Sequence, residues 1–172
     1  MPITVILSKR DEHHARMKGA DTVAVCRAMN FQPRNETMGD VTRESGTIDG
    51  FRSEYAVARL FDLDEPEINI ESDGGIDFFI GDTTVDVKCT RMKDPALIFD
   101  SMDKFKADVA ILTSVTGDDG PIHVWGWITP KKFEELAHHH NFGYGDRLVM
   151  NASDLIPIES FWLNLQKKKF RK

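Results

Sequence analysis

Three residues of the segment SDGGIDFFIGDTTVDVKCTR (72–91) have the types and spacing that chemistry requires: Asp77, Asp86 and Lys88. Carboxylates are ligands for a hard divalent ion such as Mg²⁺, which is commonly held by one or two carboxylates together with a substrate phosphate. A neighbouring lysine could hold a phosphate or a metal-bound water. Such a set can offset transition-state charge and lower the pKa of an attacking water, so it predicts metal-assisted chemistry on a phosphate ester.

These side chains can meet only if the segment folds as a hairpin. Two apolar runs flank Gly81-Asp82, and a glycine at the first central position predicts a two-residue type II′ turn. The turn sets three cross-strand pairs: Ile80 with Thr83, Phe78 with Val85, and Asp77 with Asp86. Directly opposed residues have Cβ atoms ~4.5–5.5 Å apart, so two facing carboxylates repel unless a cation lies between them.

Side chains alternate across a strand, so each face of this hairpin can be written down. One face is apolar and belongs to the core: Ile76, Phe78, Ile80, Val85, Val87 and Cys89. The other carries Asp77, Phe79, Thr84, Asp86 and Lys88. The simpler alternative is that this second face is only the solvated outer face of a hairpin.

A third carboxylate precedes the hairpin. The segment GFRSEYAVARLF (50–61) predicts a helix, and Glu54 shares a face with Val57, Ala58 and Phe61 by the i, i+3, i+4, i+7 rule. A carboxylate on an apolar face is costly unless it is paired or binds a metal, which makes Glu54 a candidate outer metal ligand. Alternatively, it lies at the edge of that face and reaches solvent near the helix start, where the helix dipole favours it.

The order of these motifs resembles a known family. The segments that carry the resemblance are SEYAVA (53–58) after Gly50, GIDF (75–78), VDVKCT (85–90) and VWGWITPKKF (124–133). They resemble the PD-(D/E)XK nuclease superfamily, and most closely its small phage-type members. The resemblance covers about residues 50–135. The chain departs from the family pattern where Ile76 precedes Asp77, because the proline that names the family is missing, and Asp86 is an allowed variant of the second acidic position.

The resemblance implies a restriction-endonuclease-like core and a Mg²⁺-dependent (or Mn²⁺-dependent) nuclease that hydrolyses DNA phosphodiester bonds. It implies that Asp77 and Asp86 ligate the metal with the backbone carbonyl of Val87. Lys88 would position or activate water, and Glu54 would complete the site directly or through water. Two rivals stay open: a non-catalytic nucleic-acid-binding or assembly module on the same fold, and a metal-dependent phosphatase.

Charge informs the choice of partner. Arg91 and Lys93 follow the strand that carries Asp86, and they are the candidates for contacts to a DNA backbone. The net charge is −6, and because residues 167–172 contain five basic residues, residues 1–166 carry −11. An acidic body predicts modest affinity for DNA in the absence of metal. The sequence leaves open whether the chain works as a monomer or as a homodimer.

The remaining sequence predicts the elements around this site. The 172 residues fit one α/β domain with a central mixed β-sheet flanked by helices, divided into an N-terminal helix and loop (1–49), a catalytic core (50–135) and a basic tail (167–172). Helices are expected at 11–30, 50–61, 130–139 and 157–167, with a long loop at 31–49. Strands are expected at 67–70, 75–80, 83–90, 108–115, 122–128 and 147–150.

Two further observations concern histidine and compartment. His138, His139 and His140 are expected at the end of a helix, where consecutive side chains diverge by about 100° and cannot share a metal ion. The two tryptophans Trp125 and Trp127 are expected on one face of a strand. Two cysteines cannot build a disulfide framework, and no apolar run reaches the ~20 residues of a membrane span. The sequence therefore predicts a cytoplasmic protein without membrane contact.

Overall fold

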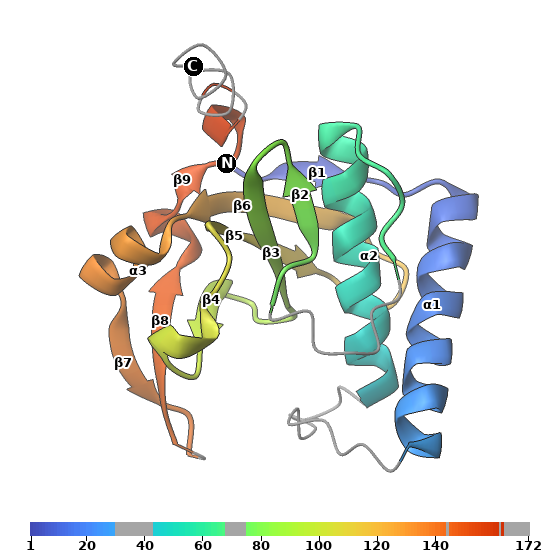
Figure 1. The fold of residues 1–172 in the computed structure, drawn as a ribbon, viewed down its shortest axis with the longest axis horizontal. Helices are drawn as coiled ribbons and strands as arrows, with labels where there is room; N and C mark the ends of the chain where they lie inside the picture. Colours follow the sequence, from blue (N-terminus) through green and yellow to red (C-terminus); the bar gives the residue numbers. More distant parts are fainter. Residues whose placement is uncertain (30–42, 68–74, 144, 162, 164–172) are drawn as a thin grey trace.

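The computed structural model describes residues 1–29, 43–67, 75–143, 145–161 and 163 (Figure 1). Its elements are β1 (Ile3–Val5), α1 (Lys9–Ala28), α2 (Arg43–Phe61), β2 (Phe78–Ile80), β3 (Thr83–Thr90), β4 (Ala96–Phe99), the 3₁₀ turn η1 (Met102–Lys104), β5 (Val109–Val115), β6 (Ile122–Ile128), α3 (Pro130–Leu136), β7 (His138–Asn141), β8 (Asp146–Asn151), the 3₁₀ turn η2 (Ala152–Asp154) and β9 (Ile156–Pro157).

The main sheet is mixed, as predicted. Its strands lie in the order β1-β6-β5-β3-β2, with β9 also pairing with β6. The β3–β5 pair is parallel, and the other pairs are antiparallel. A second, three-stranded sheet has the order β4-β8-β7. The chain is therefore an α/β protein, and β3 lies between its hairpin partner β2 and the parallel strand β5.

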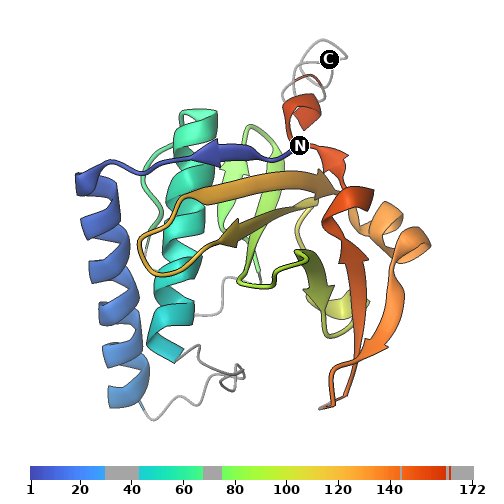
Figure 2. The ribbon, with the colours of Figure 1, turned by 180° about the vertical axis from the view of Figure 1, so that it is seen from behind.

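Helix α2 covers one face of the main sheet, and α1 packs against the outer side of α2 (Figures 1 and 2). The inner helix α2 contributes Val57, Ala58 and Phe61 to a core that includes Val85 of β3 and Ile111 of β5. The outer helix α1 begins after Ser8, whose side chain accepts a hydrogen bond from the Asp11 N–H at 3.1 Å. This layer positions one side of β3 and leaves the other side to the second sheet.

Close packing of α1 on α2 explains a glycine in the middle of α1. A Cβ at Gly19 would lie 2.7 Å from Ile48 Cγ1 and 2.9 Å from Ile48 Cα. Any larger residue would push the two helices apart. Glycine therefore allows α1 and α2 to approach closely here, although it lowers the helix propensity of α1.

The opposite face of the main sheet packs against the small sheet and α3. Phe99 of β4, Phe105 after η1 and Phe133 of α3 form a ring cluster with centroid separations of 4.6 to 5.7 Å. Ala110 and Leu112 of β5 join the same core. This second core supports the face of β3 that carries the polar residues.

Helix boundaries differ most from the predictions in α2 and α3, whereas α1 is displaced by two residues at each end. α2 begins at Arg43, so the predicted loop is wrong for residues 43–49. α3 ends at Leu136, and His138–Asn141 form strand β7 paired with β8, not a helix end. In a strand, His138 and His140 point to the same face, so the helical argument about their divergence does not apply. Residues 30–42 and 68–74, the basic tail (167–172) and part of the predicted last helix (162 and 164–167) lie outside the described residues. The predicted start of that last helix at residue 157 is wrong, because Pro157 lies in β9.

A register shift separates the two tryptophans. β6 is irregular beside Leu112 and Thr113, and Gly126 faces Leu112 whereas Val124 faces Thr113. Trp127 consequently packs in the core under α2, while Trp125 packs against the core of the small sheet. The prediction that both share one face is wrong because the bulge reverses the alternation.

Within the described residues, no helix combines the length and the apolar character that a membrane crossing needs.

Candidate active site on the second hairpin strand

The β2–β3 hairpin forms with the predicted turn. Gly81 has φ +63°, Asp82 does not have a positive φ, and this pattern of signs is that of a type II′ turn. Phe78 faces Val85 and Ile80 faces Thr83, both as predicted. The turn chemistry therefore sets the register of the hairpin.

The ladder ends one residue before the predicted Asp77–Asp86 pair. β2 begins at Phe78, and the Asp77 N–H donates at 2.8 Å to the carbonyl of Val85, the residue that Phe78 already faces. Two residues opposite one is the pairing of a bulge. Asp77 therefore approaches β3 from the end of β2 instead of facing Asp86 across a regular ladder.

The Asp77 side chain is turned onto the backbone of β3. Its Oδ2 accepts a hydrogen bond from the Val87 N–H at 2.6 Å. In a regular antiparallel ladder that N–H would donate to a carbonyl of the partner strand, so the carboxylate takes the place of the strand. This contact brings Asp77 to the residue that lies between Asp86 and Lys88.

Asp86 and Lys88 form a close ion pair on the face of β3 that looks away from α2. Lys88 Nζ lies 2.6 Å from Asp86 Oδ1. Asp86 is 1% exposed, whereas 38% of the Lys88 side chain is exposed. The ammonium also lies 5.5 Å from the centre of the Phe99 ring, within range of a cation–π contact. A buried carboxylate thus has a partly exposed cation at its outer side.

Gly75 lies beside this carboxylate. A Cβ at this position would stand 3.6 Å from Asp86 Oδ2 and 3.8 Å from the carbonyl oxygen of Lys104. The glycine has φ +82°, a conformation that side-chain-bearing residues rarely adopt. No side chain of residue 75 therefore occupies the space next to Oδ2.

Glu54 is half-buried on α2, the helix that packs on the other face of β3. Its face-mates Val57, Ala58 and Phe61 are in the helix-side core, as the periodicity predicts. Among the described residues, no group of three or more His, Cys, Asp and Glu side chains is arranged to hold a metal ion. The structure brings Asp86 into contact with Lys88 and places Asp77 on the adjoining Val87 N–H. The role of Glu54 as an outer metal ligand stays a prediction.

Arg91, a candidate for DNA contact, is engaged within the protein. Its guanidinium donates to Asp49 Oδ2 at 2.5 Å and to Asp118 Oδ1 at 2.8 Å. The hydrogen bond to Asp49 is the main cause of a raised pKa of Arg91, and the hydrogen bond from Arg91 lowers the pKa of Asp118. Arg91 thereby ties the end of β3 to α2 and to the β5–β6 loop. Lys93 is exposed in the loop between β3 and β4.

Sequence reasoning missed a buried arginine at the junction of α1, α2 and the β5–β6 loop. Arg52 is 1% exposed, and it contacts Glu12 at 2.8 Å, Asp49 at 3.6 Å and the Gly120 carbonyl at 2.6 Å. The i, i+3 spacing of Asp49 and Arg52 was its only local signal, because Glu12 and Gly120 are distant in sequence. This junction is structural: it joins the helical layer to the sheet.

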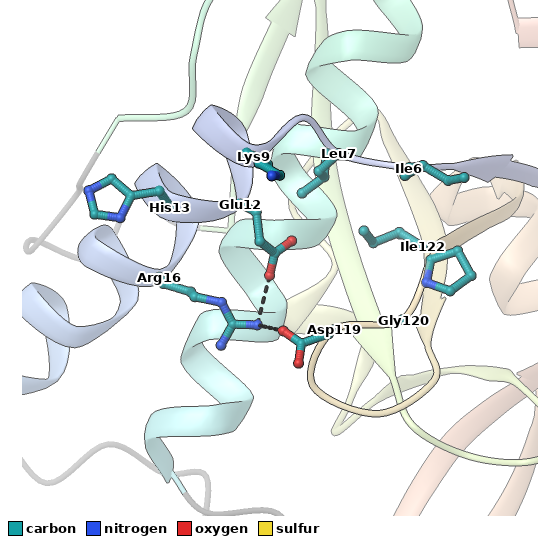
Figure 3. A pocket seen from close by; sticks show the side chains of 10 residues that line it. Ile6, Leu7, Lys9, Glu12, His13, Arg16, Asp119, Gly120 and Ile122 are labelled. Carbon is teal, nitrogen blue, oxygen red and sulfur yellow. Dashed lines mark hydrogen bonds and ion pairs between the residues drawn. The ribbon is translucent and has the colours of Figure 1, made fainter.

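A shallow cavity of about 590 Å³ lies beside this junction, between the start of α1 and the β5–β6 loop (Figure 3). Arg16 bridges Glu12 at 2.8 Å and Asp119 at 2.7 Å on its wall. Both carboxylates already neutralise the arginine, and the cavity includes none of the hairpin residues described above. It is therefore a different place from the Asp77–Asp86–Lys88 cluster.

Comparison of the chain with models of protein families, with curated proteins and with solved structures finds no match.

Proposed function

We propose that the protein is a metal-dependent nuclease with a restriction-endonuclease-like core. Its active site, formed by Asp77, Asp86 and Lys88, would hydrolyse DNA phosphodiester bonds. The observation that carries the proposal is the buried Asp86 carboxylate, 2.6 Å from Lys88 Nζ, with Asp77 held on the intervening Val87 N–H at 2.6 Å. A hairpin whose polar face were only solvated would have no reason to bury one carboxylate at 1% exposure and turn a second onto the same strand.

The residues present fit a hard divalent cation. Asp77 and Asp86 offer carboxylate oxygens, and Val87, which follows Asp86 in the sequence and donates its N–H to Asp77, offers its backbone carbonyl. Mg²⁺ is usually held by one or two carboxylates and completes its shell with water and substrate phosphate, so a cluster of three acidic side chains is not required. Because residue 75 is a glycine, it places no side chain next to Asp86 Oδ2. Asp77, Asp86 and Val87 would hold the ion, with Mn²⁺ as the alternative to Mg²⁺.

When bound, the ion would supply Lewis acidity and positive charge at the phosphate. The protein's own part begins with Lys88, whose ammonium is partly exposed and can donate to a phosphate oxygen or to a water molecule. The oxygen of that water attacks phosphorus, the bond from phosphorus to a sugar oxygen breaks, and the departing oxygen takes a proton while the water loses one. Asp86 holds Lys88 in position through the 2.6 Å contact. Phe99 packs below the ammonium.

The positions of Arg91 and Lys93 refine the proposed DNA contact. Arg91 already has two carboxylate partners, so a phosphate would have to compete with both of them. Lys93 is exposed on the loop that follows β3 and is the better candidate of the two. Together with the acidic body of the chain, this arrangement favours weak binding of DNA until the metal is present.

Plasmid cleavage tests the proposal. Supercoiled DNA is incubated with the full-length protein in Mg²⁺, in Mn²⁺ or in EDTA, with the wild type, Asp86→Ala and Lys88→Ala. Matched controls remove the same charges from α1, on the other side of the molecule: Asp21→Ala and Lys9→Ala, both at exposed positions. We expect nicked or linear DNA in either metal and none in EDTA. The two site variants should lose at least 100-fold in rate, and the two controls should keep it.

Two outcomes would overturn this proposal. DNA binding without cleavage in any metal would favour the non-catalytic module. Metal-dependent release of phosphate from nucleotides, with no cleavage of the polymer, would favour a phosphatase.

A further inference from the structure

One exposed aromatic side chain lies on the face of the hairpin that carries the proposed site. Phe79 is 69% exposed, whereas its strand neighbours Phe78 and Ile80 are each 8% exposed. Phe79 faces Thr84, and Thr84 alternates onto the same side of the hairpin as Asp86 and Lys88. Among the large hydrophobic side chains that are exposed in the described part of the chain, Phe79 is the one aromatic.

The fold does not account for this ring. The hairpin buries its other face through Phe78, Ile80 and Val85, so Phe79 adds nothing to that core. β2 is the edge strand of the main sheet, and no further strand pairs beyond it in the described residues. An exposed aromatic on a three-residue edge strand exposes apolar surface at some cost in solubility.

The position suits one nucleotide next to a phosphate at the proposed site. Phe79 faces Thr84, and Thr84 precedes Asp86 by two residues on β3, which is roughly 6.8 Å along the strand. The charges beyond it are negative: Asp82 is exposed at the turn, and Asp108 accepts hydrogen bonds from the Thr84 N–H and hydroxyl at 2.9 Å each. Carboxylates repel a phosphate but do not oppose an uncharged base. The tip of the hairpin can therefore stack on a base, but it does not bind the phosphate backbone of the DNA.

We propose that Phe79 stacks on an unpaired base of the nucleotide next to the phosphate held at Asp77, Asp86 and Lys88. The inference rests on the proposed nuclease function and narrows its substrate to single-stranded DNA or to duplex ends and junctions with unpaired bases. A base in a regular duplex has both faces covered by its neighbours, so it would have to leave the stack to reach the ring.

A fluorescent base tests the stacking directly. The probe is a short single-stranded oligonucleotide with 2-aminopurine at each position in turn, mixed with the full-length protein in Ca²⁺ to limit cleavage. The variants are Phe79→Ala, Phe79→Leu and Phe79→Trp. The matched control is Met17→Ala, which removes an exposed apolar side chain from α1. Cleavage of the unlabelled oligonucleotide in Mg²⁺ is measured on the same preparations.

We expect 2-aminopurine to be quenched at one position in the wild type, Phe79→Trp and Met17→Ala, and not in Phe79→Ala or Phe79→Leu. Affinity should fall by about 5- to 150-fold in Phe79→Ala, because base–aromatic stacking contributes about 1–3 kcal/mol per base. Equal quenching and affinity in Phe79→Ala and the wild type would overturn the stacking while leaving cleavage intact. If the wild type stacked the base through Phe79 and did not cleave, the nuclease function would fail and the stacking would stand. A wild type that neither bound nor cleaved would overturn both.

Discussion

Removing the cation from the Asp86–Lys88 pair should destabilise the protein measurably. In Lys88→Met, the carboxylate of Asp86, which is 1% exposed in the wild type, loses the ammonium at 2.6 Å. Truncating one partner of a buried pair costs about 3–5 kcal/mol. Because 38% of the lysine side chain is exposed, solvent already screens part of the pair, and about 2–3 kcal/mol is the expected loss. The corresponding fall in Tm is about 4–12 °C for a chain of this length.

Urea unfolding of four proteins measures this loss: the wild type, Lys88→Met, Asp86→Asn and the double variant. In the double variant both charges are gone, and replacing a whole buried pair is often neutral, so most of the stability should return. The m-value should stay constant, because the surface exposed on unfolding does not change. Two results would refute the pairing of these residues. One is a free energy of unfolding of Lys88→Met within about 0.5 kcal/mol of the wild type, and the other is a double variant whose loss of stability equals the sum of the two single losses.

Three further predictions concern the helical layer. Gly19→Ala gains about 1 kcal/mol of helix propensity but places a Cβ 2.9 Å from the Ile48 backbone, and such overpacking costs about 1–3 kcal/mol. Urea unfolding should therefore show a lower free energy of unfolding for Gly19→Ala than for the wild type. A higher free energy of unfolding would contradict the close approach of α1 and α2. Burial and the hydrogen bond to Glu65 raise the pKa of Tyr55 to about 12, so the free energy of unfolding should decrease between about pH 10 and 12. A titration followed by absorbance at 295 nm should show one tyrosine that ionises near pH 12, and Tyr55→Phe should remove that transition. The hydrogen bonds from Arg59 hold the pKa of Asp11 below its usual value, so their stabilisation is present above about pH 4 and disappears as pH falls through the lowered pKa. In Asp11→Asn, the free energy of unfolding should therefore fall less steeply with decreasing pH below about pH 4. The same pH dependence in Asp11→Asn and the wild type would contradict the Asp11–Arg59 ion pair.

The parts of the fold that local chemistry determines could be predicted from the sequence. β3 has the predicted bounds, Thr83–Thr90, because a glycine turn and strict alternation specify both its start and its faces. β6 likewise runs from Ile122 to Ile128 as predicted. β4 was missed because its four residues follow a proline and look like part of a loop until they pair with β8.

The parts that depend on distant contacts could not be predicted. Periodicity identifies the buried face of α2 that includes Glu54, but it does not say on which side of the sheet the helix docks. The bulge at Asp77 arises because its carboxylate takes the Val87 N–H, a choice that the alternation of residues does not reveal. Arg91 looks like a free cation in the sequence, and it is neutralised by Asp49 and Asp118 only after the chain has folded.

A crystal structure with Mn²⁺ and a short DNA with unpaired ends would test the central proposal most directly. The proposal predicts an anomalous peak bound by carboxylate oxygens of both Asp77 and Asp86, with a phosphodiester oxygen within hydrogen-bond distance of Lys88 Nζ. An ion bound elsewhere, or DNA that leaves this face of β3 uncovered while Lys88 stays on Asp86, would contradict it.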